Sequence, residues 1–409
     1  MQKGVRGRLL WAGAAILALA TSCRPGGDEV QAFLDAHWIV PLPAQGAPPP
    51  GRPALEASLG ADDCGHCHSA QHADWHASRH AQTMRAGILW QFDVFDQYES
   101  NRCMQCHAPL AEQKALIALE RTWPDRPASA PPGYIPPDLH RQGLTCAACH
   151  VRAHVRHGPP SVAGVRPDAP ELPHGGFVAS AAFGDSRFCS LCHQFPDDGP
   201  RLAGKLRQDT YNEWRASRHA TAGTTCQQCH MPDRRHLWRG IGDAEMVRSA
   251  LSVDLRAAPR DSDRMYVRAT LVNTGAGHRF PTYLVPRVDV RLWLQSPDGE
   301  RTLLAEHVIQ WRASVDLEIE YFDQRLAVDE GRVLEGTFAR PPMDGWRAVL
   351  AVEVAPKEHY ERTYRHMLEQ SAQMGPKTVA LLRQALEEAE ASRFLAFESS
   401  IPIQTPPIR

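Results

Sequence analysis

The sequence has little of what a membrane-spanning or nucleic-acid-binding protein requires. Its only long apolar run covers residues 9–20, which is too short to cross a bilayer. The formal net charge is −2, so there is no electrostatic reason to bind nucleic acid, and none is expected as a partner. Cysteine is absent after Cys229. Any chemistry that needs cysteine is therefore confined to the part of the chain before that residue.

Ten of the eleven cysteines stand in one motif, Cys-x-x-Cys-His, which occurs five times. This is the attachment pattern of a c-type haem, in which two thiols bond to the macrocycle and the histidine binds the iron. Residues three apart share one face of a helical turn, so both sulfurs reach the same macrocycle edge. The predicted attachment residues are Cys64, Cys67, Cys103, Cys106, Cys146, Cys149, Cys189, Cys192, Cys226 and Cys229. The predicted proximal iron ligands are His68, His107, His150, His193 and His230.

Two other chemistries use paired cysteines, and neither fits this spacing. A zinc ribbon shares one metal ion between two Cys-x-x-Cys pairs, whereas this chain has an odd number of pairs. A disulfide framework would not require a histidine after every second cysteine. The sequence therefore predicts five covalently bound haem c groups.

The N-terminus predicts export. Lys3, Arg6 and Arg8 precede the apolar run, which is typical of a secretory signal peptide, here predicted over residues 1–22. Cys23 follows in Ala20-Thr-Ser-Cys23, which resembles a bacterial lipobox, and the alternative is ordinary cleavage nearby. We predict a periplasmic protein that a lipid on Cys23 anchors to the inner or outer membrane through a Pro-rich tether over residues 23–54.

One internal repeat lies within the haem module. Asp74-Trp-His-Ala-Ser-Arg-His80-Ala is followed later by Glu213-Trp-Arg-Ala-Ser-Arg-His219-Ala. A shared helix face would explain the tryptophan but not the shared histidine. We expect these histidines to close the second axial position of a haem, which makes a bis-histidine electron carrier.

Three further histidines are predicted as distal ligands. His236 follows the last motif, and His278 lies between glycines in Asn273-Thr-Gly-Ala-Gly-His278-Arg-Phe-Pro, where the backbone can approach a flat cofactor closely. His157 is preferred as the fifth ligand, with His174 and His140 left open as alternatives. Methionine ligation through Met84 or Met231 ranks below these. The predicted distal set is His80, His219, His236, His278 and His157.

Beyond the last motif the apolar period changes. Leu251, Val253 and Leu255 alternate with polar residues, and similar runs follow at 267–271 and 288–294, which predicts antiparallel strands in a small sandwich. From residue 356 the pattern becomes helical, with a break near Gly375. The expected fold class is α+β: a haem-organised, mostly helical and loop-rich module, then a small antiparallel β-sandwich and C-terminal helices. The predicted domains are 55–240 for the haem module, 245–355 for the β-sandwich-like domain, and 356–409 for the C-terminal helical segment and tail.

These motifs carry a family resemblance. The five Cys-x-x-Cys-His sites, the two Trp-x-x-Ser-Arg-His-Ala segments and the Cys226-Gln-Gln-Cys-His-Met-Pro ending resemble multihaem c-type cytochromes of the cytochrome c-554/c-552 domain family. The resemblance implies covalent haem c, mostly bis-histidine ligation and periplasmic electron transfer, with His80 and His219 at the motif's histidine positions. Five sites exceed the four of the tetrahaem prototype, and no Cys-x-x-Cys-Lys site is present.

Two functions remain open at this stage. The first is electron transfer between other redox proteins, which needs no substrate pocket because neighbouring haems exchange electrons directly. The second is a multihaem oxidoreductase acting on a small nitrogen or sulfur compound at one five-coordinate haem, with Arg152, Arg156 or His157 beside the iron. A docking role for the β domain is a third class.

Overall fold

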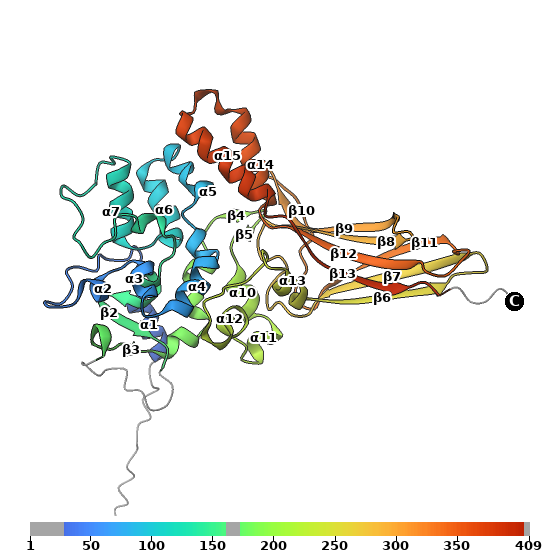
Figure 1. Cartoon of the computed structure of the whole chain (residues 1–409), viewed down its shortest axis with the longest axis horizontal. Coiled ribbons are helices and arrows are strands. Elements are labelled where there is room, and N and C mark those ends of the chain that lie inside the picture. The colour runs from blue at the N-terminus through green and yellow to red at the C-terminus, as the bar shows by residue number, and fades with distance from the viewer. Residues whose placement is uncertain (1–27, 161–171, 405–409) are drawn as a thin grey trace, which may run out of the picture.

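The computed structural model describes residues 28–160 and 172–404. The predicted signal peptide and Cys23 lie outside the described residues. A loop-rich helical part is followed by an elongated β part, so the fold is an α+β arrangement of helices and antiparallel sheets (Figure 1). None of the helices in the described ranges is long and apolar enough to span a bilayer.

The helical part is built from short helices joined by loops. Its α-helices are α1 Glu29–His37, α2 Ala54–Ala57, α3 Ala61–Gly65, α4 Ser69–Ala77, α5 Ala86–Leu89, α6 Gln97–His107, α7 Ala111–Glu120, α8 Cys146–His150, α9 Arg187–His193, α10 Thr210–Arg215, α11 Arg218–Thr221 and α12 Cys226–His230. Its 3-10 turns are η1 His80–Gln82, η2 Gln91–Asp93, η3 Leu139–Arg141, η4 Pro173–Gly175, η5 Ala181–Gly184 and η6 Pro232–Arg234. Short strands are β1 Val151–Arg152, β2 Val155–Gly158, β3 Val178–Ala179, β4 Arg201–Leu202 and β5 Lys205–Leu206.

Residues 28–54, which were predicted as a tether, begin with a helix that packs on the rest of the helical part. Asp28 caps α1 by accepting from the Gln31 amide, and the helix buries Leu34 and His37. His37 Nε2 donates to the Cys149 carbonyl at 2.9 Å. The first part of the predicted tether is therefore a helix packed beside the third motif, because it carries an apolar face that a Pro-rich spacer lacks.

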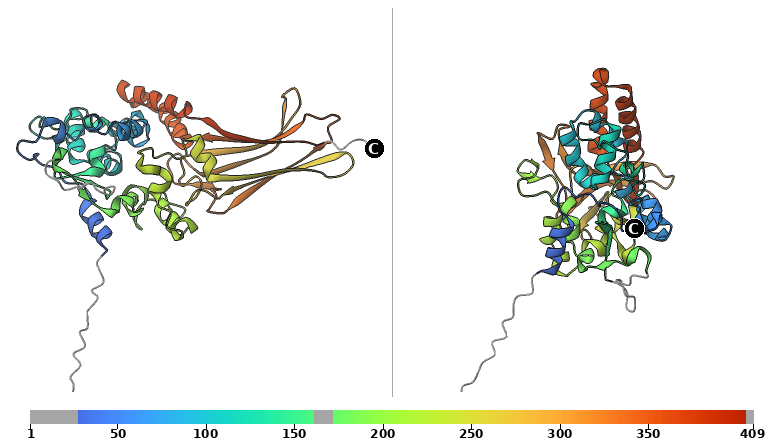
Figure 2. Two further views of the ribbon diagram at one scale, coloured as in Figure 1. Left: turned by 60° about the horizontal axis from the view of Figure 1, so that its bottom comes forward. Right: turned by 90° about the vertical axis from the view of Figure 1, so that its left-hand side faces the viewer.

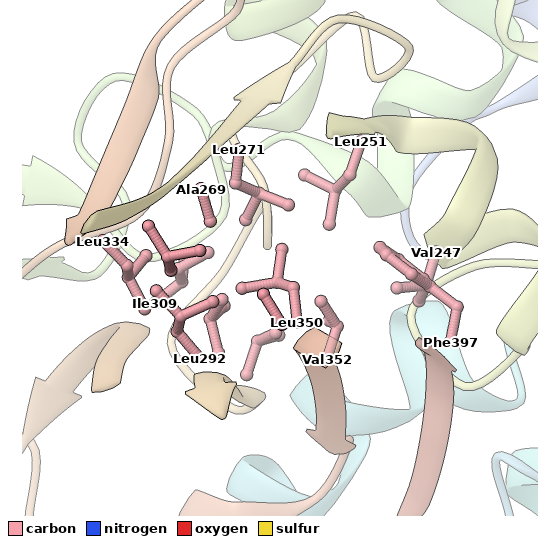
Figure 3. Packing of buried hydrophobic residues seen from close by; sticks show 14 of the residues in the cluster. Val247, Leu251, Ala269, Leu271, Leu292, Ile309, Leu334, Leu350, Val352 and Phe397 are labelled. Carbon is pink, nitrogen blue, oxygen red and sulfur yellow. The ribbon is translucent and has the colours of Figure 1, made fainter. Parts of the chain in front are cut away.

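The β part forms a sandwich of two antiparallel sheets. One sheet has the strand order β10-β9-β8-β12-β13, and the other β11-β7-β6. The strands are β6 Leu251–Pro259, β7 Arg264–Asn273, β8 Arg287–Gln295, β9 Arg301–Ala313, β10 Glu320–Asp323, β11 Gly331–Ala339, β12 Arg347–Ala355 and β13 Phe394–Pro402. Alternate residues of both sheets meet in one core, which Figure 3 shows around Leu271, Leu292 and Leu350. Helix α13, Ala244–Ala250, adds Val247 to this core.

The predicted C-terminal helices form a hairpin that leaves the sandwich. Helices α14, Glu358–Glu369, and α15, Pro376–Glu390, are separated by η7, Ser371–Gln373, before β13 rejoins the five-stranded sheet beside β12. The hairpin extends over the helical part, where α15 contacts α5 (Figures 1 and 2). Residues between the last two strands of the β part therefore pack on the helical part.

Candidate haem centres

The five Cys-x-x-Cys-His motifs are held in helical turns, and each is named here by its histidine. Four of the histidines, His107, His150, His193 and His230, end the helix that carries their cysteines, and His68 caps the start of α4. All ten motif cysteines are free. Each motif thus presents two thiols and an imidazole from about one helical turn, as haem attachment requires.

The motif histidines are oriented with one nitrogen available. Nδ1 of His107 donates to the Thr83 carbonyl at 3.2 Å, and Nδ1 of His150 to the His157 carbonyl at 2.8 Å. Nδ1 of His230 donates to the Arg239 carbonyl at 2.6 Å. A carbonyl can only accept, so the proton is on Nδ1 and Nε2 carries the lone pair that binds a metal.

Three motif histidines have a second histidine ring opposite them. The ring centroids are 6.4 Å apart for His193 and His80, 6.1 Å for His150 and His236, and 6.3 Å for His230 and His278. Two imidazoles that bind one metal from opposite sides, each through a bond of about 2 Å, have centroids roughly 6 Å apart. The three pairs therefore have the spacing of bis-histidine ligation.

The paired histidines are also neutral, as ligands must be. Burial lowers the pKa of His150, His193 and His278 to about 4, and that of His80 to about 3. Nδ1 of His278 donates to the Arg279 carbonyl at 2.9 Å. The donor set therefore fits haem iron at these three sites.

The tryptophans of the repeat hold the chain just before a motif. Trp75 Nε1 donates to the Leu144 carbonyl at 2.8 Å, and Trp214 Nε1 donates to the Thr224 carbonyl at 3.0 Å. Each carbonyl lies two residues before the first cysteine of a motif, the third and the fifth respectively. The tryptophans of the two copies thus make equivalent hydrogen bonds just before two of the motifs.

The first residue of each copy of the repeat is acidic. It hydrogen-bonds the segment that carries the second histidine of the same site. Asp74 Oδ2 accepts from the His236 amide at 3.1 Å. Glu213 Oε2 accepts from the Arg279 amide at 2.9 Å and from Thr282 Oγ1 at 3.2 Å. Burial raises the pKa of Glu213, whereas the Arg235 side chain lowers that of Asp74. Sequence reasoning did not predict these roles, although the repeat keeps an acid at this position.

Removing the Glu213 acceptor should loosen His278. Glu213→Ala leaves the half-buried Arg279 amide without its partner, at a cost of about 1 kcal/mol. Electron paramagnetic resonance should then show a high-spin ferric fraction that the parent lacks at this site, and Glu213→Gln should largely restore the low-spin signal because its amide oxygen still accepts. Glu335→Ala, an exposed acid on β11, is the control. Equal spectra for Glu213→Ala and Glu335→Ala would refute the positioning role.

The structure does not pair the remaining predicted ligands. His219 lies beside the Gly277 turn, and its buried Nε2 has no hydrogen-bond partner, but no motif histidine contacts its ring. The carbonyl of His157 holds His150, while its ring meets His37 edge-on at 5.3 Å. His174 has Nδ1 bonded to the Gly176 carbonyl, and burial lowers its pKa, with the His68 charge adding to this effect.

Other histidines already use the nitrogen that a ligand needs. His140 Nε2 bonds to Glu120 at 2.9 Å, and His154 Nε2 donates to the Gly46 carbonyl at 2.8 Å. Within residues 28–160 and 172–404 there is no cluster of three or more histidine, cysteine or acidic residues that could hold a bare metal ion. Haem iron needs at most two protein ligands, because the macrocycle supplies the rest.

No family model and no curated relative matches the chain. Among solved structures, a penta-haem cytochrome c552 from Thermochromatium tepidum matches with a TM-score of 0.56 and 18% identity, covering 85% of this chain and 100% of that one. A match to a β-glucosidase from Kluyveromyces marxianus has a TM-score of 0.14 and carries no argument. The chain therefore shares its overall fold with a pentahaem c-type cytochrome.

Proposed function

We propose that this protein is an exported multihaem c-type cytochrome that carries electrons between redox partners through five covalently bound haems. The observation that carries the proposal is the coincidence of five attachment motifs with three histidine pairs at 6.1–6.4 Å. Haem c would supply the redox chemistry, and the protein would supply axial ligation and burial. The similarity of fold to a pentahaem cytochrome supports this proposal.

The ligand assignments follow the pairs. We assign His80 to the His193 site, His236 to the His150 site and His278 to the His230 site. For the His68 site, His174 is better supported than His157. The Nδ1 atom of His174 is hydrogen-bonded and its Nε2 is free, and the charge of His68 is one of the causes that lower the pKa of His174. His219 stays a possible ligand with no assigned site, since its buried Nε2 is free.

The attachment thiols indicate how the sites are connected. The pairs whose thiols shift one another's pKa by hydrogen bonding are Cys64 with Cys146, Cys106 with Cys192, and Cys189 with Cys226. Cys149 also raises the pKa of both Cys189 and Cys192, with burial and their hydrogen-bonded partners acting more strongly. The His193 site therefore adjoins the His107, His150 and His230 sites. We propose that electrons entering at one end of the module are distributed through it.

The haem count tests the proposal directly. Pyridine haemochrome analysis of the exported protein should give five haems per chain, and stepwise reductive titration should give several overlapping one-electron waves. Fewer than four haems per chain would refute the proposed five-haem architecture. Periplasmic location, redox-protein partners and a lipid on Cys23 belong to the same proposal, and a Cys23→Ala variant that stayed in the membrane fraction would remove the anchor from it.

A second function is favoured by one observation. Only three of the five motif histidines have a second histidine ring in contact, and His68 and His107 have none. A multihaem oxidoreductase acting on a small nitrogen or sulfur compound at a five-coordinate haem is therefore the alternative.

A further inference from the structure

A cavity of about 510 Å³ lies between three helices of the helical part, α1, α9 and α10. Figure 2 shows α1, in dark blue, at the outer edge of that part. The walls of the cavity include Leu34, Asp35, Trp38, Leu191, Tyr211 and Arg215. Cavities of roughly 300–1,000 Å³ that combine apolar walls with a few polar groups are typical of small-molecule sites.

The cavity lies on the face of α9 that is turned away from its own attachment thiols. Cys189 and Cys192 are one helical turn apart and project from one face of this helix. Ser190 and Leu191 stand between them in the sequence, so they project from the opposite face, where both line the cavity. No motif cysteine and no motif histidine lines it. A ligand there would be separated from the attachment thiols by the width of one helix, about 10 Å.

The apolar wall of the cavity is preformed. Leu34 is buried on α1. Trp38 is held by two neighbours, since Arg152 Cζ lies 4.9 Å from its ring centroid and the Phe188 ring meets it edge-on at 5.2 Å. A side chain fixed in this way offers an aromatic surface without further ordering, and a flat aromatic ligand can pack against it.

The charges around the cavity do not favour an anion. Arg187 also lines it, but this guanidinium is already paired with Asp28 at 2.5 Å and with Asp185 at 2.9 Å. Arg215 and Asp35 add one charge of each sign. Three carboxylates thus accompany two guanidinium groups, so a neutral ligand fits the cavity better than a phosphate ester does.

Hydrogen-bonding groups stand on two different walls. On α10, Arg215 lies 6.0 Å from the Tyr211 ring centroid, and in the described part of the chain neither its guanidinium nor the Tyr211 hydroxyl has a hydrogen-bond partner. On α1, Asp35 Oδ1 accepts from Gln31 Nε2 at 2.8 Å, which leaves Oδ2 for another donor. The cavity therefore offers donors from α10 and an acceptor from α1, beside an aromatic wall.

Helix α1 also limits how far the cavity can lie from a membrane. Cys23 stands five residues before Asp28 in the sequence. Five residues span at most about 18 Å, so the lipid proposed for Cys23 would keep α1 close to the bilayer surface. A molecule dissolved in the bilayer would then reach the cavity over a short distance. Quinols are neutral, aromatic, lipid-soluble and redox-active, and they carry an oxygen at each end of the ring.

We propose that this cavity binds a quinol and that the bound quinol donates electrons to the haem of the fourth motif. The ring packs against Trp38, one oxygen accepts from Arg215, and the hydroxyl at the other end donates to Asp35. On oxidation both O–H bonds break and the quinol leaves as the quinone. Its two electrons reduce two ferric haems in turn, and its two protons pass to Asp35 and to water. The proposal rests on the function proposed above and names the class of its electron donor.

Binding is measured apart from electron transfer. Equilibrium dialysis of the oxidised holoprotein against menadione, a two-ring quinone, should give one bound molecule per chain. Arg215→Gln should weaken this binding about tenfold, the loss of one hydrogen bond from a charged group. Trp38→Ala should weaken it by a similar factor, because the aromatic contact is lost. Arg201→Gln removes an exposed cation from β4 and is the matched control, with an unchanged affinity expected.

Electron donation is measured with menadiol, the reduced form of menadione. The rate of haem reduction should saturate with menadiol concentration, and Arg215→Gln should raise the half-saturating concentration about tenfold. Dithionite, which needs no binding site, should reduce the parent and all variants at equal rates.

Three results would overturn the proposal. They are no menadione binding by the parent, equal affinities in Arg215→Gln and Arg201→Gln, and a reduction rate that rises linearly with menadiol in every variant. In a chain that carries five haems, each of these results removes the quinol site and leaves the proposed function standing. A count below four haems would instead refute the proposed function.

Discussion

His278→Ala is expected to turn one low-spin haem into a high-spin haem and to add one equivalent of carbon monoxide binding to the reduced holoprotein. The ring centroids of His278 and His230 are 6.3 Å apart and their ring planes differ by 10°. No other histidine ring contacts His230. The loop around it is fixed, since Asn273 Nδ2 donates to the His278 carbonyl at 2.9 Å and Glu213 holds the Arg279 amide.

The measurement compares electron paramagnetic resonance spectra and carbon monoxide titrations of the variant and the parent. His366→Ala is the matched control, because His366 is an exposed histidine of the same C-terminal half and bonds only to Gln370. Unchanged spectra and carbon monoxide stoichiometry in His278→Ala would leave His278 a turn residue. The β-sandwich would then be an appendage of the haem module.

The five candidate attachment motifs are recognisable in the sequence because the chemistry that they predict is local. A Cys-x-x-Cys-His motif contains everything that covalent attachment needs within one helical turn. The strands of the sandwich were predictable for a similar reason, since β6 and β8 alternate apolar and polar residues in the sequence as they do in burial. Both features depend only on residues that are neighbours along the chain.

The distal side was less predictable because it depends on contacts between distant residues. Sequence reasoning preferred His157 to His174, yet His157 serves His150 through its carbonyl, and main-chain roles leave no trace in residue type. The glycines around His278 were expected to meet a cofactor. In the structure a Cβ at Gly275 would lie 2.0 Å from the Ser249 carbonyl, and one at Gly277 would lie 3.1 Å from Trp214. The close neighbours of both glycines in the structure are therefore protein atoms, which the sequence did not predict.

The C-terminal hairpin shows the same limit. Two helices with a break near Gly375 were predicted, and α14 and α15 confirm them. Nothing in their sequence says that they pack on α5 and not on the sheet beside them. Their apolar residues would suit either surface, and only the three-dimensional path of the chain decides.

The largest expected effect is the loss of order in the helical part when haem is not attached. Its apolar clusters are small, the largest having eight buried residues, whereas the sandwich core has twenty-two. Sixteen of the nineteen buried side-chain atoms without a hydrogen-bond partner in the described residues precede residue 240, and each costs about 1–3 kcal/mol. A macrocycle bonded to two cysteines and one or two histidines would supply the apolar contacts that these clusters lack, as staples do in small scaffolds.

A chain made in the cytoplasm without residues 1–22 receives no haem and tests this account. Hydrogen exchange should be near the unfolded rate in α6, α8 and α9, while β8, β9 and β12 should remain protected by about 1,000-fold or more. The holoprotein should be protected in both parts, which controls for intrinsic exchange rates. Strong protection of α6, α8 and α9 in the haem-free chain would mean that their own side chains suffice to fold them. The haems would then bind to a scaffold that folds without them. The small apolar clusters would have to be stabilised by polar contacts around α6 and α7, such as the hydrogen bonds that Gln113 donates to the Leu139 and Gly143 carbonyls.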